Sequence, residues 1–170
     1  MASVDRSGEG ESGSEPSRYK VPAGSLKARL AQDMRAALKG GEKVRLSTLR
    51  LLSAAVTNTE VELGHPVTDE EFVGVASREV KRRREAIEAY TAAGRPDRAA
   101  IEREEQGVLE TYLPPGLSEH EVDQLIEEAV AATGAGPAEI GKVMSFVMAR
   151  AKGRVDGKKV QERVRARLGG

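Results

Sequence analysis

The chain has 170 residues, of which 39% are apolar and 32% charged, and its 27 basic and 27 acidic side chains leave a formal net charge of zero. Aromatic residues make up only 3%, so the core must be built from aliphatic side chains, which favours packed helices over a β-sandwich. The absence of cysteine excludes disulfides, thiolate metal sites and a cysteine nucleophile.

Residues 1–24 are rich in Ser, Gly and Glu, with two prolines and few apolar side chains. Such a composition cannot offset the entropy lost on ordering, so we predict a disordered leader. The segment lacks the basic-then-apolar pattern of a signal peptide, and no apolar run in the chain approaches the length of a membrane span. We therefore expect a cytoplasmic protein.

Four helices are predicted between residues 25 and 113, because apolar side chains recur there at helical spacing. The first begins after the N-cap Ser25, and the third begins at the capping box Thr68–Glu71. The expected ranges are about 26–40, 42–63, 68–94 and 96–112. The apolar stripe of the first helix is expected to consist of Leu26, Leu30, Met34 and Leu38.

The run Pro114-Pro115-Gly116 interrupts this pattern, and we predict a domain boundary there. Three further helices are expected: one that begins at the capping box Ser118–Glu121, one over about 137–151 and one over about 156–168. The predicted fold is all-α, with a helical bundle of about four helices over residues 25–113 and a small three-helix tail domain over residues 117–170.

The balanced total charge hides an uneven distribution. Residues 118–136 hold five acids and no base, whereas residues 137–170 hold nine bases and three acids, a balance of +6. A stretch of this charge is a reasonable footprint for a phosphate backbone. The alternative is that these bases pair with the acidic helix next to them or are solvated.

A second basic cluster consists of Lys81, Arg82, Arg83 and Arg84. Four consecutive helical residues span roughly 300° of the helix, so they cannot all contact one ligand. We expect a solvated, salt-bridged face, with Lys81 paired to Glu85 and Arg84 paired to Glu88.

The sequence supplies little catalytic chemistry. Residues 136–142 fit the first seven positions of a P-loop, but Val143 stands where a Ser or Thr must bind magnesium, and no strand is expected before it. His65 and His120 have no neighbours at metal-ligand spacing. No catalytic residue, metal site or cofactor is therefore predicted.

Three stretches resemble the GatB/YqeY family in its stand-alone form, and the similarity extends from about Leu26 to Leu168. The first stretch is Glu79–Tyr90 followed by Ala93–Asp97, and the second is Glu110–Pro114 leading into Leu117–Glu119. The third and strongest is Ile140–Met144 together with Lys152–Lys158. The chain departs from the family pattern at Ile140, where Met is usual, and at Ala149, where Pro is common.

The resemblance implies a helical domain followed by a small helical tail domain. In the B subunit of the tRNA-dependent amidotransferase, the similar C-terminal region contacts the outer body of tRNA. The ATP- and magnesium-dependent chemistry there belongs to a larger domain, and ammonia comes from a separate subunit. The resemblance thus implies a tRNA-contacting module without the catalytic part.

Three functions remain open. The first is a non-catalytic module that binds tRNA by shape and phosphates, and the second is an adaptor that docks on an amidotransferase or another translation protein through an exposed apolar stripe on the third helix. The third is a carbon–nitrogen ligase or amidase with glutamine as nitrogen donor, as the family label suggests. Neither DNA nor a membrane is expected as a partner.

Charge and resemblance together select the candidate residues. The candidate RNA contacts are Lys142, Lys152, Arg154, Lys158, Lys159 and Arg163, with the cluster of residues 81–84 as a secondary candidate. Gly141, Gly153 and Gly157 are candidates for the close approach of a backbone, with tight helix packing as the alternative.

Overall fold

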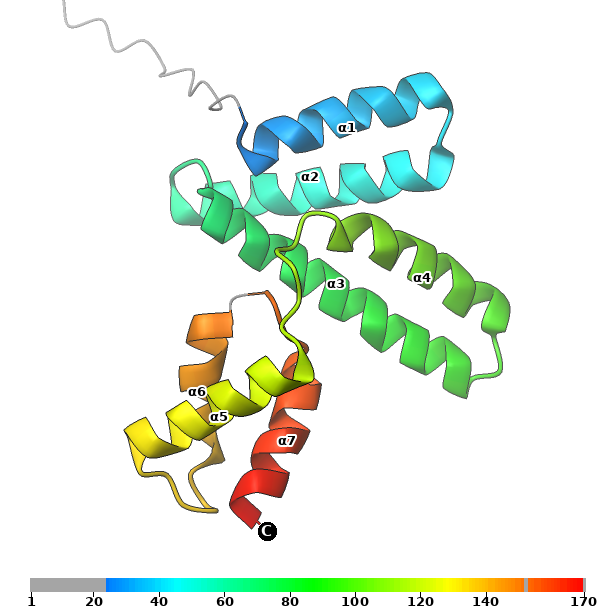
Figure 1. Ribbon diagram of the computed structural model, residues 1–170. Helices are drawn as coiled ribbons and strands as arrows, with labels where there is room; N and C mark the ends of the chain where they lie inside the picture. The colour runs from blue at the N-terminus through cyan, green and yellow to red at the C-terminus, as the bar shows by residue number, and fades with distance from the viewer. Residues whose placement is uncertain (1–23, 152, 170) are drawn as a thin grey trace, which may run out of the picture.

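The computed structural model describes residues 24–151 and 153–169, which form seven α-helices and no strand (Figure 1). The prediction of an all-α fold is confirmed. The leader predicted for residues 1–24 lies outside the described residues apart from Gly24, as does Lys152. The helices are α1 (Leu26–Gly40), α2 (Lys43–Leu63), α3 (Asp69–Ala92), α4 (Pro96–Glu110), α5 (Glu119–Thr133), α6 (Ile140–Ala151) and α7 (Gly157–Gly169).

Local signals account for most helix ends. The Ser25 hydroxyl accepts a hydrogen bond from the amide of Ala28, and complete capping boxes open α3 and α5. Three ends lie two or more residues from the prediction, and one of them is the end of α3, at Ala92 rather than at residue 94. Helix α6 begins at Ile140 rather than near residue 137, because Glu139 closes a turn by accepting from the amide of Gly136 at 3.1 Å. Helix α4 ends at Glu110, where tight turns lead the chain into Pro114.

The helices form two groups with separate hydrophobic cores. The first core lies among α1–α4 and the second among α5–α7. Phe72, Leu49, Leu52 and Val56 are among the fully buried residues of the first, and Val143, Val147, Val160 and Val164 are fully buried in the second. The segment 111–118, which contains the predicted boundary at Pro114-Pro115, joins the two groups (Figure 1).

The predicted stripe of α1 is wrong at its last position. Leu38 is 62% exposed, whereas Ala37 is completely buried. Residues four apart drift around the helix, and over twelve residues from Leu26 the drift reaches about 120°. Ala37 lies within about 20° of Leu26 on the helix, so it replaces Leu38 on the buried face.

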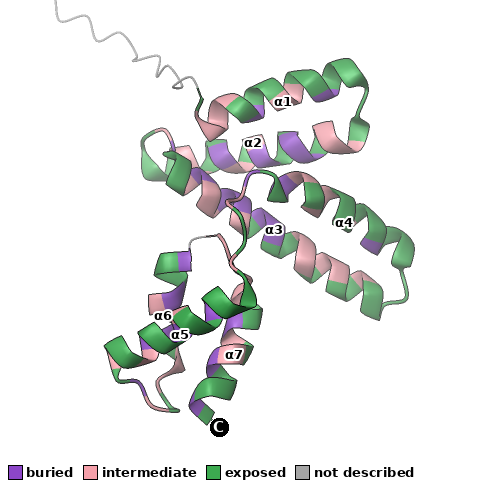
Figure 2. Cartoon of the chain, viewed as in Figure 1, coloured by how far each residue is buried: buried purple, intermediate pink, exposed green. Residues whose placement is uncertain are grey.

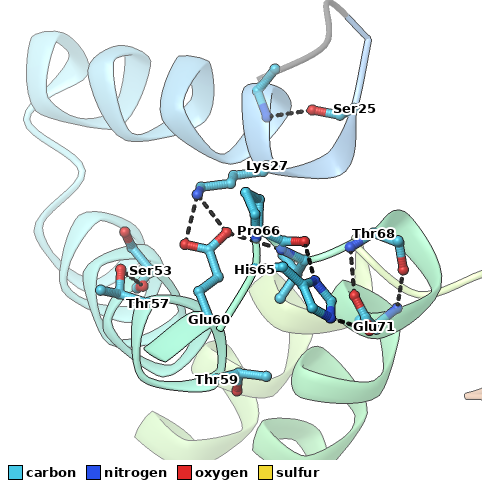
Figure 3. Close-up of polar contacts among 12 residues, drawn as sticks. Ser25, Lys27, Ser53, Thr57, Thr59, Glu60, His65, Pro66, Thr68 and Glu71 are labelled. Atoms are coloured by element: carbon cyan, nitrogen blue, oxygen red, sulfur yellow. Dashed lines mark hydrogen bonds and ion pairs between the residues drawn. The ribbon is translucent and has the colours of Figure 1, made fainter. Parts of the chain in front are cut away.

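A polar cluster ties α1 to the far end of α2 (Figure 3). The Lys27 ammonium lies 2.6 Å from the Glu60 carboxylate, which also accepts from the amide of Val67 at 3.1 Å. Burial raises the pKa of Glu60, but these hydrogen bonds and the charge of Lys27 outweigh it and lower the pKa below its usual range. The cluster fixes the turn that leads from α2 into α3.

Candidate nucleic-acid interface

The acidic helix α5 neutralises part of α7. The guanidinium of Arg163 lies 2.9 Å from Glu119 and 2.6 Å from Asp123, and Arg167 forms an ion pair with Glu127. Residues 118–136 carry a net charge of −5 and residues 137–170 a net charge of +6, so the two segments together carry only +1. For Arg163 the structure shows the alternative that the sequence left open, pairing with the neighbouring acidic helix.

The segment 153–156 lies at the junction of the two groups rather than on the open surface of the tail. Arg154 donates from Nε to the carbonyl of Pro115 at 2.9 Å, and its own carbonyl accepts from the amide of Leu117 at 2.9 Å. A Cβ on Gly153 would lie 2.7 Å from the Ser77 hydroxyl of α3. For Arg154 and Gly153, internal packing accounts for the family motif.

Ion pairs extend the junction on both sides. Lys158 of α7 lies 3.0 Å from Glu88 of α3, with both side chains more than 60% exposed. Arg84 of α3 lies 3.5 Å from Asp156 and 3.5 Å from Glu110. The predicted pair of Arg84 with Glu88 is thus wrong, because each residue instead reaches a partner across the junction. An open cleft of about 490 Å³ lies between α3, the segment 111–118 and the segment 153–156.

The other members of the second basic cluster point in different directions. Lys81 lies 3.9 Å from Glu85, as predicted, and Arg82 lies 2.9 Å from the nearly buried Glu79. Both pairs lie on α3. The cluster therefore forms a salt-bridged surface, not one charged patch.

Arg83 turns inward and ties α3 to α4. Its Nε lies 2.8 Å from Glu105 and 3.7 Å from Glu102, and all three side chains are less than 20% exposed. Burial raises the pKa of Glu105, and the positive charge of Arg83 opposes this rise. Arg83 is thus occupied inside the first group.

Residues at the start of α6 have no comparable packing. Nothing lies within 4 Å of a Cβ built on the exposed Gly141, so the alternative of tight helix packing does not apply to this glycine among the described residues. Lys142 is 60% exposed and pairs with Glu139 in its own turn. A Cβ built on Gly157, in contrast, would lie 3.6 Å from the Met148 side chain, an ordinary contact distance.

Two exposed bases on α7, Lys159 and Arg165, form no ion pair with another described residue. Lys159 is one of the RNA contacts predicted from the sequence, whereas Arg165 is not among them. Helical spacing in the sequence could have identified Arg165 as solvent-facing. Arg163 and Arg167 are four residues apart and share the side that faces α5, so Arg165 lies about 160–200° around the helix from them.

The remaining polar residues form no metal-binding group. In the described part of the chain, no three His, Asp or Glu side chains gather in a way that suits a metal ion. His65 donates from Nδ1 to the carbonyl of Pro66 at 2.9 Å, and its Nε2 lies 3.7 Å from Glu71 (Figure 3). No described helix is both long and apolar enough to cross a membrane.

Comparison with known proteins adds the family context. Residues 27–168 match the family described as Yqey-like protein. Over 156 residues the chain is 28% identical to "Altered inheritance of mitochondria protein 41, mitochondrial" of Pyrenophora tritici-repentis, covering 90% of this chain and 86% of that protein. A protein of the same name from Vanderwaltozyma polyspora is 26% identical over 102 residues, covering 58% of this chain and 55% of the relative.

Proposed function

The chain belongs to the Yqey-like protein family, and we propose that it is a non-catalytic module that binds tRNA by shape and phosphates through its tail group. One observation carries the proposal: Gly141 and Lys142 lie exposed at the amino-terminal end of α6, with open space beside the glycine. A glycine within a helix costs up to about 1 kcal/mol relative to alanine. Gly141 makes no packing contact that offsets this cost, which suits a position that an external backbone approaches.

The chemistry at this end of α6 suits a phosphate. The helix dipole favours negative charge at this end, although the amide of Lys142 already donates to the Glu139 carbonyl at 3.0 Å. The ion pair of Lys142 with Glu139 is exposed and is worth at most about 1 kcal/mol, so the ammonium can exchange its carboxylate partner for a phosphate. On another helix of the tail group, α7, Lys159 and Arg165 are exposed cations that need no such exchange.

Two further observations favour this function over its alternatives. The large exposed apolar side chains of the described residues lie on α1, α2, α4 and α6, whereas the adaptor hypothesis required them on α3. In the cleft at the junction, Arg84 pairs with Glu110 and Asp156, and Arg154 also lines it, so two bases and two acids balance there. A ligase or amidase would instead need polar groups that converge on a substrate.

The proposal includes the kind of RNA contact and the compartment. With 3% aromatic residues the chain offers few side chains on which bases can stack, which favours recognition of shape and phosphates. We place the protein in the cytoplasm. The word "mitochondrial" in the relatives' name supplies the alternative compartment, and fractionation of cells that express the tagged protein distinguishes the two.

The test is the fluorescence anisotropy of labelled bulk tRNA titrated with the protein at about 50 and about 200 mM salt. We expect micromolar or tighter binding that weakens at least tenfold at the higher salt. The variant Lys142→Glu/Lys159→Glu should lose most of this binding. Arg154 and Lys158 are left intact, because substituting them would disturb the junction.

The matched control is Arg98→Glu/Arg103→Glu. Both arginines lie exposed on α4 without an ion pair to another described residue, so the change in net charge is the same. Equal weakening by the two variants would show a nonspecific charge effect and contradict a tail interface. If the intact protein fails to bind at about 50 mM salt, the RNA-binding function itself is wrong.

A further inference from the structure

A group of bases lies at the closed end of the hairpin formed by α1 and α2, here called the hairpin end and defined as residues 35–50. It holds five bases and one acid. Arg45 pairs with Glu42 at 3.3 Å and with Asp33 at 3.8 Å. The other four bases are exposed and form no ion pair with another described residue: Arg35, Lys39, Lys43 and Arg50.

Helix geometry explains why these four side chains face solvent. In α1 the core side is marked by Leu30 and Ala37, and Arg35 and Lys39 lie on the opposite side, one turn apart. In α2, Lys43 and Arg50 are two turns apart and lie away from the buried Leu52. Figure 2 shows most of this end of the hairpin in the colour of exposed residues.

The turn between the helices brings the two pairs to the same end of the molecule. Gly41 adopts a left-handed conformation with φ of 67°, and its amide donates back to the carbonyl of Leu38. The last turn of α1 is therefore followed at once by the first turn of α2. Figure 1 shows the hairpin end at the tip of the α1–α2 pair, on the side away from the start of α1.

The local structure gives no reason for a base at the start of α2. Lys39 lies in the last turn of α1, where the helix dipole favours a cation. Lys43 is the first residue of α2, whose first turn holds no acid, so the dipole disfavours its charge. Like Arg35 and Arg50, Lys43 forms no ion pair with another described residue.

We propose that the hairpin end is a second contact surface for the phosphate backbone of a structured RNA. This inference rests on the proposed function and adds a site on the other helical group. The four free bases outnumber those on α7, where the acids of α5 already occupy Arg163 and Arg167. The two acids at this end, Glu42 and Asp33, both pair with Arg45, so the four other cations complement a polyanion. Two separated basic surfaces suit a partner that is recognised by its shape.

The experiment measures anisotropy of labelled bulk tRNA at several salt concentrations with the full chain, Lys43→Gln/Arg50→Gln, and the control Arg98→Gln/Arg103→Gln. The hairpin variant should bind about tenfold more weakly at about 50 mM salt. Its slope of log K against log salt should be shallower by about 1.8, since two phosphate contacts are lost. The α4 control should keep the affinity and the salt slope of the unsubstituted protein. The circular dichroism of all three proteins should show the same helix content.

Three other results would overturn the inference, and they differ in what they say about function. If the intact protein binds tRNA and the hairpin variant matches it, the hairpin end is not a contact surface, but the proposed function stands. If the intact protein does not bind at low salt, both proposals are wrong. If poly-glutamate displaces the tRNA as well as unlabelled tRNA does at equal charge concentration, the surface recognises acidic chains in general, such as an acidic protein segment.

Discussion

Gly153 and Ser77 meet at the junction of the two helical groups so closely that residue 153 has no room for a side chain. A Cβ on Gly153 would lie 2.7 Å from the Ser77 Oγ and 2.8 Å from a methyl of Val73. The backbone of Gly153 also has φ of +77°, a conformation that other residues rarely adopt. The glycine that the sequence predicts as a point of RNA approach is thus where the loop before α7 packs closely against α3.

Gly153→Ala should destabilise the protein by about 1–3 kcal/mol, because both the backbone and the contact become strained. Gly64→Ala is the matched control, since Gly64 has φ of +74° but nothing within 4 Å of its Cβ position. Denaturant unfolding of both variants separates backbone strain from the contact with α3. Equal losses would mean that the close approach to Ser77 contributes nothing.

Lys158 and Glu88 should show a small, salt-sensitive coupling across the junction. The pair is exposed on both sides, so a double-mutant cycle with Lys158→Met and Glu88→Gln should give about 0.2–1 kcal/mol. The coupling should vanish near 1 M salt, where the Debye length is about 3 Å. A coupling of zero at low salt would show that the two helical groups are not held together at this point.

Gly141→Ala should change stability and RNA binding in opposite directions. The new methyl enters open space and improves helix propensity, so the free energy of unfolding should rise by up to about 1 kcal/mol. Anisotropy should show weaker binding of tRNA, because the methyl blocks a close approach to the backbone. Gly107→Ala on α4, which also points into open space, should stabilise without changing binding. Unchanged binding by Gly141→Ala would remove the observation that carries the proposed function.

Asp123→Asn together with Glu119→Gln should free the guanidinium of Arg163. Both carboxylates lie within 3 Å of this side chain, and removing their charge leaves an uncompensated cation on the tail. We expect tRNA to bind several-fold more tightly at about 50 mM salt, with a slope of log K against log salt steeper by about 0.9. The same gain from Glu104→Gln/Glu62→Gln, on α4 and α2, would show that only total charge matters.

Tyr112→Phe should remove an alkaline dependence of stability. The Tyr112 hydroxyl donates to Asp33, and burial, this hydrogen bond and the Asp33 charge raise the pKa of Tyr112 well above its usual range. The folded protein therefore keeps a proton that the unfolded chain loses near pH 10, so stability from this group is complete below about pH 10 and declines above it.

At neutral pH the Phe variant should be less stable by about 1–2 kcal/mol, since Asp33 loses a hydrogen bond. The difference from the unsubstituted protein should narrow as the pH rises above about 10. Urea unfolding at pH 7, 10 and 11 checks this. A constant difference across that range would mean that Tyr112 has an ordinary pKa.

The helices and their approximate ends could be predicted because their signals are local. The hydroxyls of Ser25, Thr68 and Ser118 cap helices within three residues of themselves, and Gly41 and Gly64 end them. The exposed face of α1 could not be placed from apolar residues at every fourth position, because an α-helix completes a turn every 3.6 residues. Leu38 shows this, since it is exposed although it fits the four-residue spacing. The family also followed from sequence, since motifs spread over the chain are read directly from it.

The sequence by itself thus determined the all-α fold class and the family, because capping, periodicity and motifs act over a few neighbouring residues. Only the tertiary structure decided which bases remain free for a ligand. Arg163 meets Asp123 across 40 residues and Lys158 meets Glu88 across 70, and no local rule gives these distances. Charge can be counted along a chain, but an ion pair depends on which helices pack together, and packing is set by the whole core.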